Sequence, residues 1–209
     1  MPPVIVLGID PGSLRCGYGV VAREGGRLRV VESGVLVPGD RPVAERLGLI
    51  LAGLERLIGR ARPDEVAVEQ VFSGASARSA LVLGQARGVA LAAAARAGLP
   101  VHEYAPSAVK LAFTGSGRAG KDQMLRTARA VLGVACGLSD EADALALAVC
   151  HLARRPLAAG VPHDPAPGAA EGRAATLRRG APRVLAPRAA AARALSRLRP
   201  SRREHRGAP

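Results

Sequence analysis

Four acidic side chains lie at the ends of apolar segments, where burial of a carboxylate is unfavourable unless it is paired or binds a cation. Asp10 closes the apolar run 4–10, Glu69 closes the short apolar run 66–69, and Asp140 and Asp143 lie near the start of the last apolar helical segment. Four clustered carboxylates would raise one another's pKa values unless cations neutralise them. Oxygen ligands with no His or Cys nearby favour Mg²⁺. Two Mg²⁺ ions about 4 Å apart can activate a water and stabilise the leaving oxygen in phosphodiester hydrolysis.

Each acid also has an ordinary structural explanation. An Asp before Pro-Gly is a common turn residue, and acids in a first helical turn favour the helix dipole, with Ser139 as the predicted N-cap. The convergence of all four is harder to explain in this way. Asp140 and Asp143 lie about 60° apart around a helix, whereas Glu141 lies about 100° from Asp140. We therefore place Asp140 and Asp143 in the site and leave Glu141 out.

The elements that must position these acids follow from hydrophobic periodicity. Strands are predicted at 4–10, 17–22, 27–36, 66–69 and 101–104, and helices at 42–60, 76–97, from about 106, from about 121 and at 140–152. Three meandering strands followed by crossover connections predict an α/β fold, with a five-stranded mixed sheet flanked by helices on both faces. Strand ends then meet along one edge. A stripe is expected to dock the last helix on the sheet: Leu145, Ala148, Val149 and Leu152.

Charge divides the 209-residue chain, which has a net charge of +13, into two parts. Residues 1–156 carry a net charge of +5 and enough apolar runs for one domain, whereas residues 157–209 hold 11 Arg and 3 acids. The Ala/Arg/Pro-rich composition of this tail predicts disorder. Three explanations of it stay open: a basic arm whose DNA affinity depends on salt, a neutral product of a biased genome, or an out-of-frame read-through.

The location of the protein is predicted to be cytoplasmic, without membrane association. No uninterrupted apolar stretch reaches about 18 residues, and the N-terminus lacks the pattern of a signal peptide. The three cysteines, Cys16, Cys136 and Cys150, form no CxxC pair and predict neither a disulfide framework nor a metal knuckle.

Five motifs resemble, in order and spacing from about residue 3 to 152, those of the RuvC-type Holliday-junction resolvases. They are Gly8-Ile-Asp-Pro-Gly-Ser13, Gly17-Tyr-Gly-Val20, Val68-Glu-Gln-Val-Phe72, Leu83-Gly-Gln-Ala-Arg-Gly88 and Asp140-Glu-Ala-Asp-Ala-Leu-Ala146. The resemblance implies a ribonuclease H-like fold and a homodimer that makes paired nicks in a four-way DNA junction during recombination and repair. It also implies two Mg²⁺ per subunit, replaceable by Mn²⁺, and action with a branch-migration motor of the RuvA and RuvB type. By motif position, the catalytic and metal-binding acids are Asp10, Glu69, Asp140 and Asp143.

Candidate DNA-binding residues lie outside these acids. Phe72 by itself fits a core position better, but the resemblance implies that it stacks on a junction base. Lys110 and Lys121 are the only lysines beside 28 arginines, and both resemble phosphate-contacting lysines of the family. Arg78 and Arg118 are further candidates.

Residues 115–122 nearly match a nucleotide-binding phosphate loop. That motif needs Ser or Thr at its eighth position, where this chain has Asp122. We interpret the segment as a flexible glycine-rich loop that places Lys121 near DNA. Arg87, in the fourth of the motifs above, equally suits a structural role.

Three other functions are compatible with parts of the sequence. An RNA-processing nuclease of the same fold would share Gly-Ile-Asp-Pro-Gly, but not the later Glu-Gln-Val-Phe and Gly-Gln-Ala-Arg-Gly motifs. An actin-like ATPase or sugar kinase would need a second domain of similar size, and the tail offers no core. A non-catalytic DNA binder would leave four acids repelling phosphate.

Overall fold

The computed structural model describes residues 2–70 and 76–155, which form five strands and five helices. In chain order they are β1 (Val4–Asp10), β2 (Cys16–Glu24), β3 (Arg27–Leu36), α1 (Val43–Ala61), β4 (Glu65–Glu69), α2 (Ala77–Arg96), β5 (Val101–Tyr104), α3 (Pro106–Thr114), α4 (Lys121–Leu132) and α5 (Ser139–Arg154). Each predicted element is present with bounds shifted by a few residues at most. The predicted α/β class with a five-stranded mixed sheet is confirmed.

The sheet order is β3-β2-β1-β4-β5. β1 pairs with β2 in antiparallel register, so that Asp10 stands opposite Gly17, and β2 pairs antiparallel with β3. β4 runs parallel to both β1 and β5. The carboxyl ends of β1, β4 and β5 therefore share one edge of the sheet.

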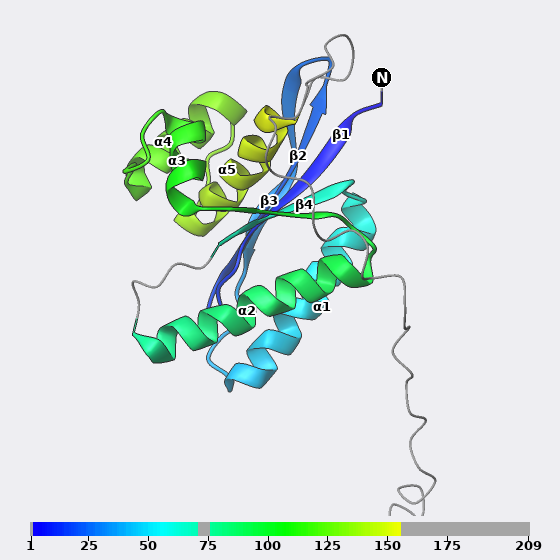
Figure 1. Ribbon diagram of the computed structural model, residues 1–209, viewed down its shortest axis with the longest axis vertical. Coiled ribbons are helices and arrows are strands. Elements are labelled where there is room, and N and C mark those ends of the chain that lie inside the picture. The colour runs from blue at the N-terminus through cyan, green and yellow to red at the C-terminus, as the bar shows by residue number, and fades with distance from the viewer. Residues whose placement is uncertain (1, 71–75, 156–209) are drawn as a thin grey trace, which may run out of the picture. The chain divides into compact units, whose positions relative to one another are not determined.

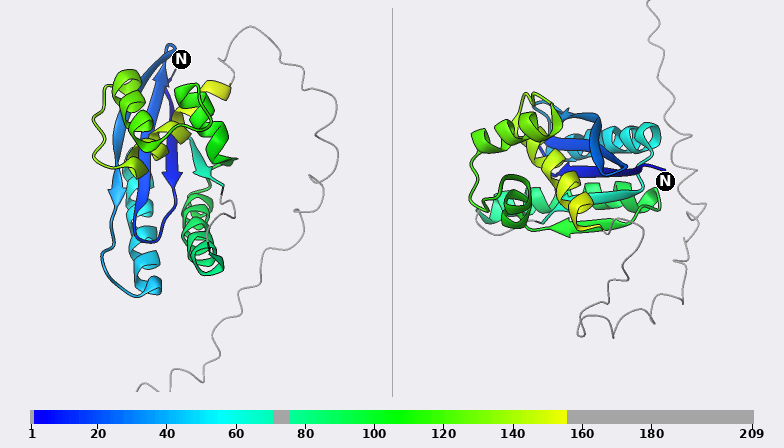
Figure 2. Two further views of the ribbon diagram at one scale, coloured as in Figure 1. Left: turned by 90° about the vertical axis from the view of Figure 1, so that its left-hand side faces the viewer. Right: turned by 90° about the horizontal axis from the view of Figure 1, so that it is seen from above.

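Helices cover both faces of the sheet (Figures 1 and 2). α1 and α2 pack on one face around the alternate β residues Leu7, Ile9, Val66 and Val68. α3, α4 and α5 cover the other face, with α5 against Val6, Val21 and Ala67. No helix within residues 2–70 and 76–155 is long and apolar enough to cross a membrane.

Helix α5 is buried more completely than its sequence predicts. The expected stripe at Leu145, Ala148, Val149 and Leu152 is buried, but so is every other residue from Ala144 to Leu152. The reason is that α5 lies between the sheet and the pair α3 and α4, so both sides of the helix face protein. The expectation of a single docking stripe was too narrow.

One local prediction needs correction. Ser139 is not the N-cap of α5: that position belongs to Leu138, and Ser139 is the first helical residue without a capping hydrogen bond. The glycine-rich segment after α3 is a short turn, in which the Thr114 hydroxyl donates to the Ser116 carbonyl and accepts from the Ser116 N–H. It follows a helix, as predicted, and Lys121 is the first residue of α4.

Candidate active site

Asp10 and Glu69 end neighbouring parallel strands. Ile9 pairs with Val68 in the β1–β4 register, so the residues that follow, Asp10 and Glu69, emerge side by side at the carboxyl edge. The two carboxyl groups are close enough for the protonated Asp10 to donate a hydrogen bond to the Glu69 carboxylate.

Two glycines allow α5 to lie directly on the strands beside this pair. A methyl group at Gly8 would stand 2.0 Å from the Ala144 carbonyl oxygen, and one at Gly17 would stand 2.0 Å from the Asp140 carbonyl oxygen. Any side chain at either position would push the helix away. Because Gly17 is the β-sheet partner of Asp10, this contact places the start of α5 beside Asp10.

The pKa of Asp10 reflects the carboxylates that lie around it. Burial, and then the charges of Glu69, Asp143 and Asp140, raise the pKa of Asp10 from 3.8 to about 8. All three partners act on the same carboxyl group, so the structure brings the four predicted acids together. Without a cation the site favours one retained proton, which is the behaviour of a cation-binding donor set.

Lys110 and Lys121 offset part of this repulsion. Burial, and then the charge of Asp143, raise the pKa of Glu69, while Lys110 acts in the opposite direction. Burial also raises the pKa of Asp143, against the lowering effects of Lys110 and Lys121. Both predicted lysines therefore lie on the α3–α4 side of the acids, close enough to stabilise their ionised forms.

The donor atoms at this edge suit a hard divalent cation. Four carboxylates provide oxygen ligands, and no imidazole contributes to the electrostatics of Asp10. The expectation that no Cys lies nearby was wrong, because Cys16 at the start of β2 is coupled to Asp10 and Asp140. Burial raises the pKa of the Cys16 thiol to about 12. Mg²⁺ also prefers oxygen to sulfur ligands, so the thiol is a poor ligand for it. The residues present fit Mg²⁺.

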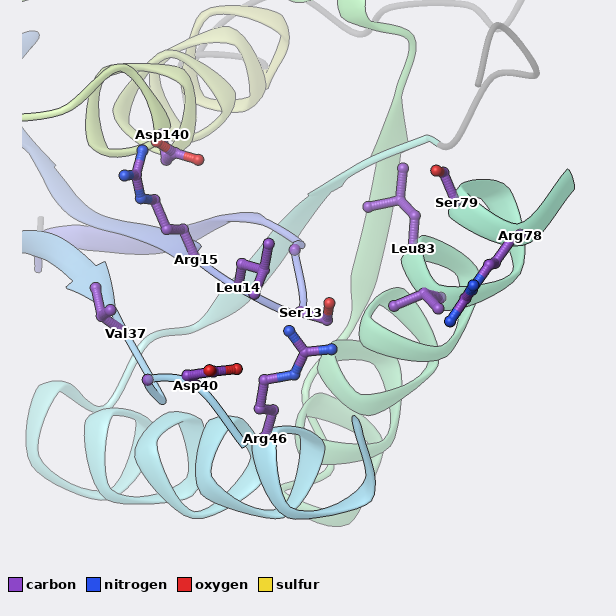
Figure 3. Close-up of a pocket in the computed structure, with 13 residues that line it drawn as sticks. Ser13, Leu14, Arg15, Val37, Asp40, Arg46, Arg78, Ser79, Leu83 and Asp140 are labelled. Atoms are coloured by element: carbon purple, nitrogen blue, oxygen red, sulfur yellow. The ribbon is translucent and has the colours of Figure 1, made fainter. Parts of the chain in front are cut away.

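A cleft of about 850 Å³ opens beside Asp140 (Figure 3). It is bounded by the β1–β2 loop, the segment after β3 and the first turns of α1 and α2, and arginines from three of these segments line it: Arg15, Arg46 and Arg78. Figure 3 shows the Arg15 side chain beside Asp140 and the predicted Arg78 on α2. The cleft thus joins the acidic site to a basic wall.

Sequence reasoning missed Arg15 and Arg46. The Nε atom of Arg46 is buried and has no hydrogen-bond partner within the described part of the chain. Such a group can serve a phosphate oxygen. Nothing local in the sequence distinguishes these two arginines among 28.

Four other residues considered in the sequence analysis lie as follows. Arg118 is exposed on the turn before α4, and Phe72 lies outside the described residues. Arg87 forms an ion pair with Glu103 at 2.5 Å, which supports its structural role. Glu141 accepts hydrogen bonds from the Ser33 hydroxyl at 2.7 Å and the Gly137 N–H at 3.1 Å, so it anchors the start of α5 away from the site.

Comparison with known proteins decides the family. Residues 6–151 match the family described as "Crossover junction endodeoxyribonuclease RuvC". The chain belongs to the RuvC family. The family member from Anaeromyxobacter dehalogenans (strain 2CP-C) is 73% identical over 206 residues, which cover 99% of this chain and all of that protein. The RuvC of Chloroflexus aggregans is 51% identical over 148 residues, which cover 69% of this chain and 90% of that protein.

Solved RuvC structures agree with this fold. Thermus thermophilus RuvC, in a complex with a Holliday junction substrate, superposes with a TM-score of 0.66 and 39% identity, covering 71% of this chain and 93% of that one. A yeast mitochondrial Holliday junction resolvase at 16% identity and a TM-score of 0.53 shares the fold. The Anaeromyxobacter similarity extends through the tail, which argues against an out-of-frame read-through.

Proposed function

We propose that this protein is a crossover junction endodeoxyribonuclease, which resolves four-way DNA junctions by hydrolysing phosphodiester bonds. The observation that carries the proposal is the convergence of Asp10, Glu69, Asp140 and Asp143 from three separate elements at one edge of the sheet. Membership of the RuvC family supplies the substrate class. An RNA-processing nuclease, an ATPase and a non-catalytic DNA binder are less well supported, because none of them accounts for both findings.

The four acids would hold two Mg²⁺ ions per subunit, and Mn²⁺ would substitute. When bound, the metal activates a water and stabilises the leaving oxygen. Asp10 and Glu69 would provide two ligands from the ends of sheet strands. Asp140 and Asp143 would provide two more from the start of helix α5. The rigidity of both supports keeps the ligand positions independent of DNA binding.

Lys110 and Lys121 would hold the scissile phosphate from the α3–α4 side. Their charges favour the ionised acids before DNA arrives, and a compact ammonium group can contact a phosphate oxygen beside the metal. The same two side chains therefore serve metal binding and substrate binding.

The arginine-lined cleft would guide the junction arms to the acids. Arg15, Arg46 and Arg78 offer forked donors for phosphate oxygens along one path, and Arg118 offers another near α4. Phe72 follows Glu69 by three residues, and we assign it to stacking on a base opened at the crossover.

The protein would act as a cytoplasmic homodimer in DNA recombination and repair. A four-way junction has near-twofold symmetry, so two identical sites can cut opposed strands and leave duplexes that a ligase can seal. A branch-migration motor of the RuvA and RuvB type would deliver the junction. Residues 1–156 form the nuclease domain in this proposal, and residues 157–209 form a basic arm.

The test compares the full chain on a synthetic four-way junction and on linear duplex, with and without Mg²⁺. We expect paired nicks in the junction, a loss of at least about 1,000-fold in Asp10→Asn with junction binding retained, and no change in the surface variant Glu55→Gln. Equal cleavage of duplex and junction would contradict the proposal, as would full activity of Asp10→Asn.

A further inference from the structure

A second cluster of titratable side chains lies at the opposite edge of the sheet. Glu65 is the first residue of β4, His102 is the second residue of β5, and His151 lies near the end of α5. One ligand atom from each lies within 4.8 Å of the others. Glu65 and Glu69 are the two ends of β4, and four strand rises separate them by about 13 Å. The cluster is therefore distinct from the candidate active site.

The two imidazoles converge on a single carboxylate oxygen. Oε2 of Glu65 lies 2.8 Å from Nε2 of His102 and 2.8 Å from Nε2 of His151. A hydrogen bond accounts for the His151 contact. The His102 nitrogen is buried and, among residues 2–70 and 76–155, has no hydrogen-bond partner, because its contact with Glu65 is poorly aligned. Each imidazole nitrogen needs its own proton to bond to this oxygen, whereas one metal ion can accept electron pairs from all three atoms.

Outer groups hold the ligand atoms in this orientation. The Tyr104 hydroxyl lies 2.7 Å from Nδ1 of His151. Without metal it donates to Nδ1, while the His151 Nε2–H donates to Glu65. With an ion bound, the ring proton would move to Nδ1 and Tyr104 would accept it, so that Nε2 becomes free to bind the metal. Arg155 binds the other Glu65 oxygen, Oε1, at 3.0 Å and leaves Oε2 free for the centre. Metal-binding histidines and carboxylates are usually fixed by outer partners of this kind.

We propose that Glu65, His102 and His151 bind one divalent transition-metal ion of the zinc, cobalt and nickel class. Two imidazole nitrogens and one carboxylate oxygen suit these ions, and water completes the coordination. Mg²⁺ gains little from imidazole and is disfavoured here. The Arg155 guanidinium repels any divalent cation alike, so the ion must gain its affinity from the two imidazoles. The His102 side chain is 41% exposed although its Nε2 is buried, so a change of its rotamer would open the cluster to an ion from solvent.

The ion would act as a clamp on the fold. It would join α5 to β4 and β5, and the other ends of α5 and β4 carry three of the four acids. Binding to the folded state alone raises stability according to the metal concentration. This inference does not depend on the proposed nuclease function.

The test uses the full chain, stripped of metal by a chelator and returned to excess Mg²⁺ so that the acidic site is filled. Titration with Co²⁺ and Zn²⁺ is followed by calorimetry and by the visible spectrum of Co²⁺. We expect one ion per chain, a Co²⁺ spectrum with nitrogen ligands, and a rise in Tm with Zn²⁺. His102→Ala, at a half-exposed position, should keep its fold and lose all three signals.

Two further variants keep the test decisive. Tyr104→Phe retains the ring but removes the hydroxyl beside His151, and should weaken binding by about 10- to 100-fold. The double variant His163→Ala/His205→Ala removes the other two histidines of the chain and should bind like the parent. The proposal is wrong if the parent binds no Zn²⁺ or Co²⁺, if His102→Ala binds as the parent does, or if only the double variant loses the ion.

Discussion

The carbonyl oxygen of Asp140 lies so close to Gly17 that a methyl group at Gly17 would stand 2.0 Å from it. Gly17 is also the strand partner of Asp10. One glycine thus fixes the distance between acids that lie 130 residues apart in the sequence. In the first two motifs, Gly8, Gly17 and Gly19 serve helix packing as much as strand formation.

We predict that Gly17→Ala displaces the start of α5 and lowers Mg²⁺-dependent junction cleavage by about 100-fold. Overpacking should also lower the free energy of unfolding by about 1–3 kcal/mol. Gly59→Ala is the matched control, because its added methyl group meets open space on α1 and should stabilise the helix by about 0.5–1 kcal/mol. Junction cleavage and urea unfolding measure both effects, and parental cleavage by Gly17→Ala would refute the packing argument.

The raised pKa of Asp10 predicts a pH-dependent stability in metal-free protein. The folded protein keeps a proton up to about pH 8 that the unfolded chain releases near pH 4. Stability from this group is therefore present below pH 4 and is lost as the pH rises through about 8. Asp10→Asn cannot ionise and should be more stable than the parent at pH 8, by up to about 5 kcal/mol.

Thermal unfolding in a chelator at several pH values checks this prediction. Mg²⁺ should raise the Tm of the parent at pH 8 more than that of Asp10→Asn, because the variant lacks one ligand. Parallel curves for the two proteins across the pH range would show that Asp10 is not the proton-binding group.

Removal of the Lys110 charge should move the pH dependence of cleavage. Lys110 lowers the pKa values of Glu69 and Asp143, so Lys110→Ala raises both, and the acid limb of the rate profile should shift to higher pH. Cleavage at neutral pH should fall by about 100-fold. Lys110→Arg retains the charge and should return the acid limb of the rate profile to its parental pH. A rate loss without any shift would assign Lys110 to DNA contact alone.

Phe72 is predicted to contribute base stacking. Phe72→Ala should weaken junction engagement by about 1–3 kcal/mol, whereas Phe72→Trp should retain most of it. A fluorescent base analogue at the crossover reports the stacking directly. Equal fluorescence in the parent and Phe72→Ala would place the ring elsewhere.

Removal of residues 157–209 should change how junction binding depends on salt. The slope of log affinity against log salt is negative, and each lost phosphate contact should make it shallower by about 0.9. Cleavage at low salt should stay near the parental level, because all four acids precede the deletion. Identical slopes with and without the tail would leave the neutral addition as its explanation.

The sequence predicted those parts of the molecule that depend on local pattern. Apolar runs that end in Asp10 and Glu69 indicated strand ends, and the spacing of Asp140 and Asp143 placed them on one helical face. Contacts between distant segments leave no such signal. The Gly17–Asp140 contact requires the sheet register, which no periodicity encodes.

The cleft and the second cluster illustrate the same limit. Arg15 and Arg46 come from different loops and helices, and only the fold places them on one wall. Glu65, His102 and His151 span almost 90 residues, without the close ligand spacing by which metal motifs are recognised in sequences. Burial of α5 on all sides from Ala144 to Leu152 was missed because alanines weaken the contrast between its faces.

The position of α5 at the end of the described fold has a consequence for synthesis of the chain. The ribosome makes β1 and β4 first, and domains fold largely in the order in which they emerge. Until α5 emerges and docks on the glycines of β1 and β2, Asp10 and Glu69 have no partners from the helix. The growing chain therefore carries two of the four predicted acids but cannot assemble the set, so the proposed nuclease site is incomplete until α5 has docked.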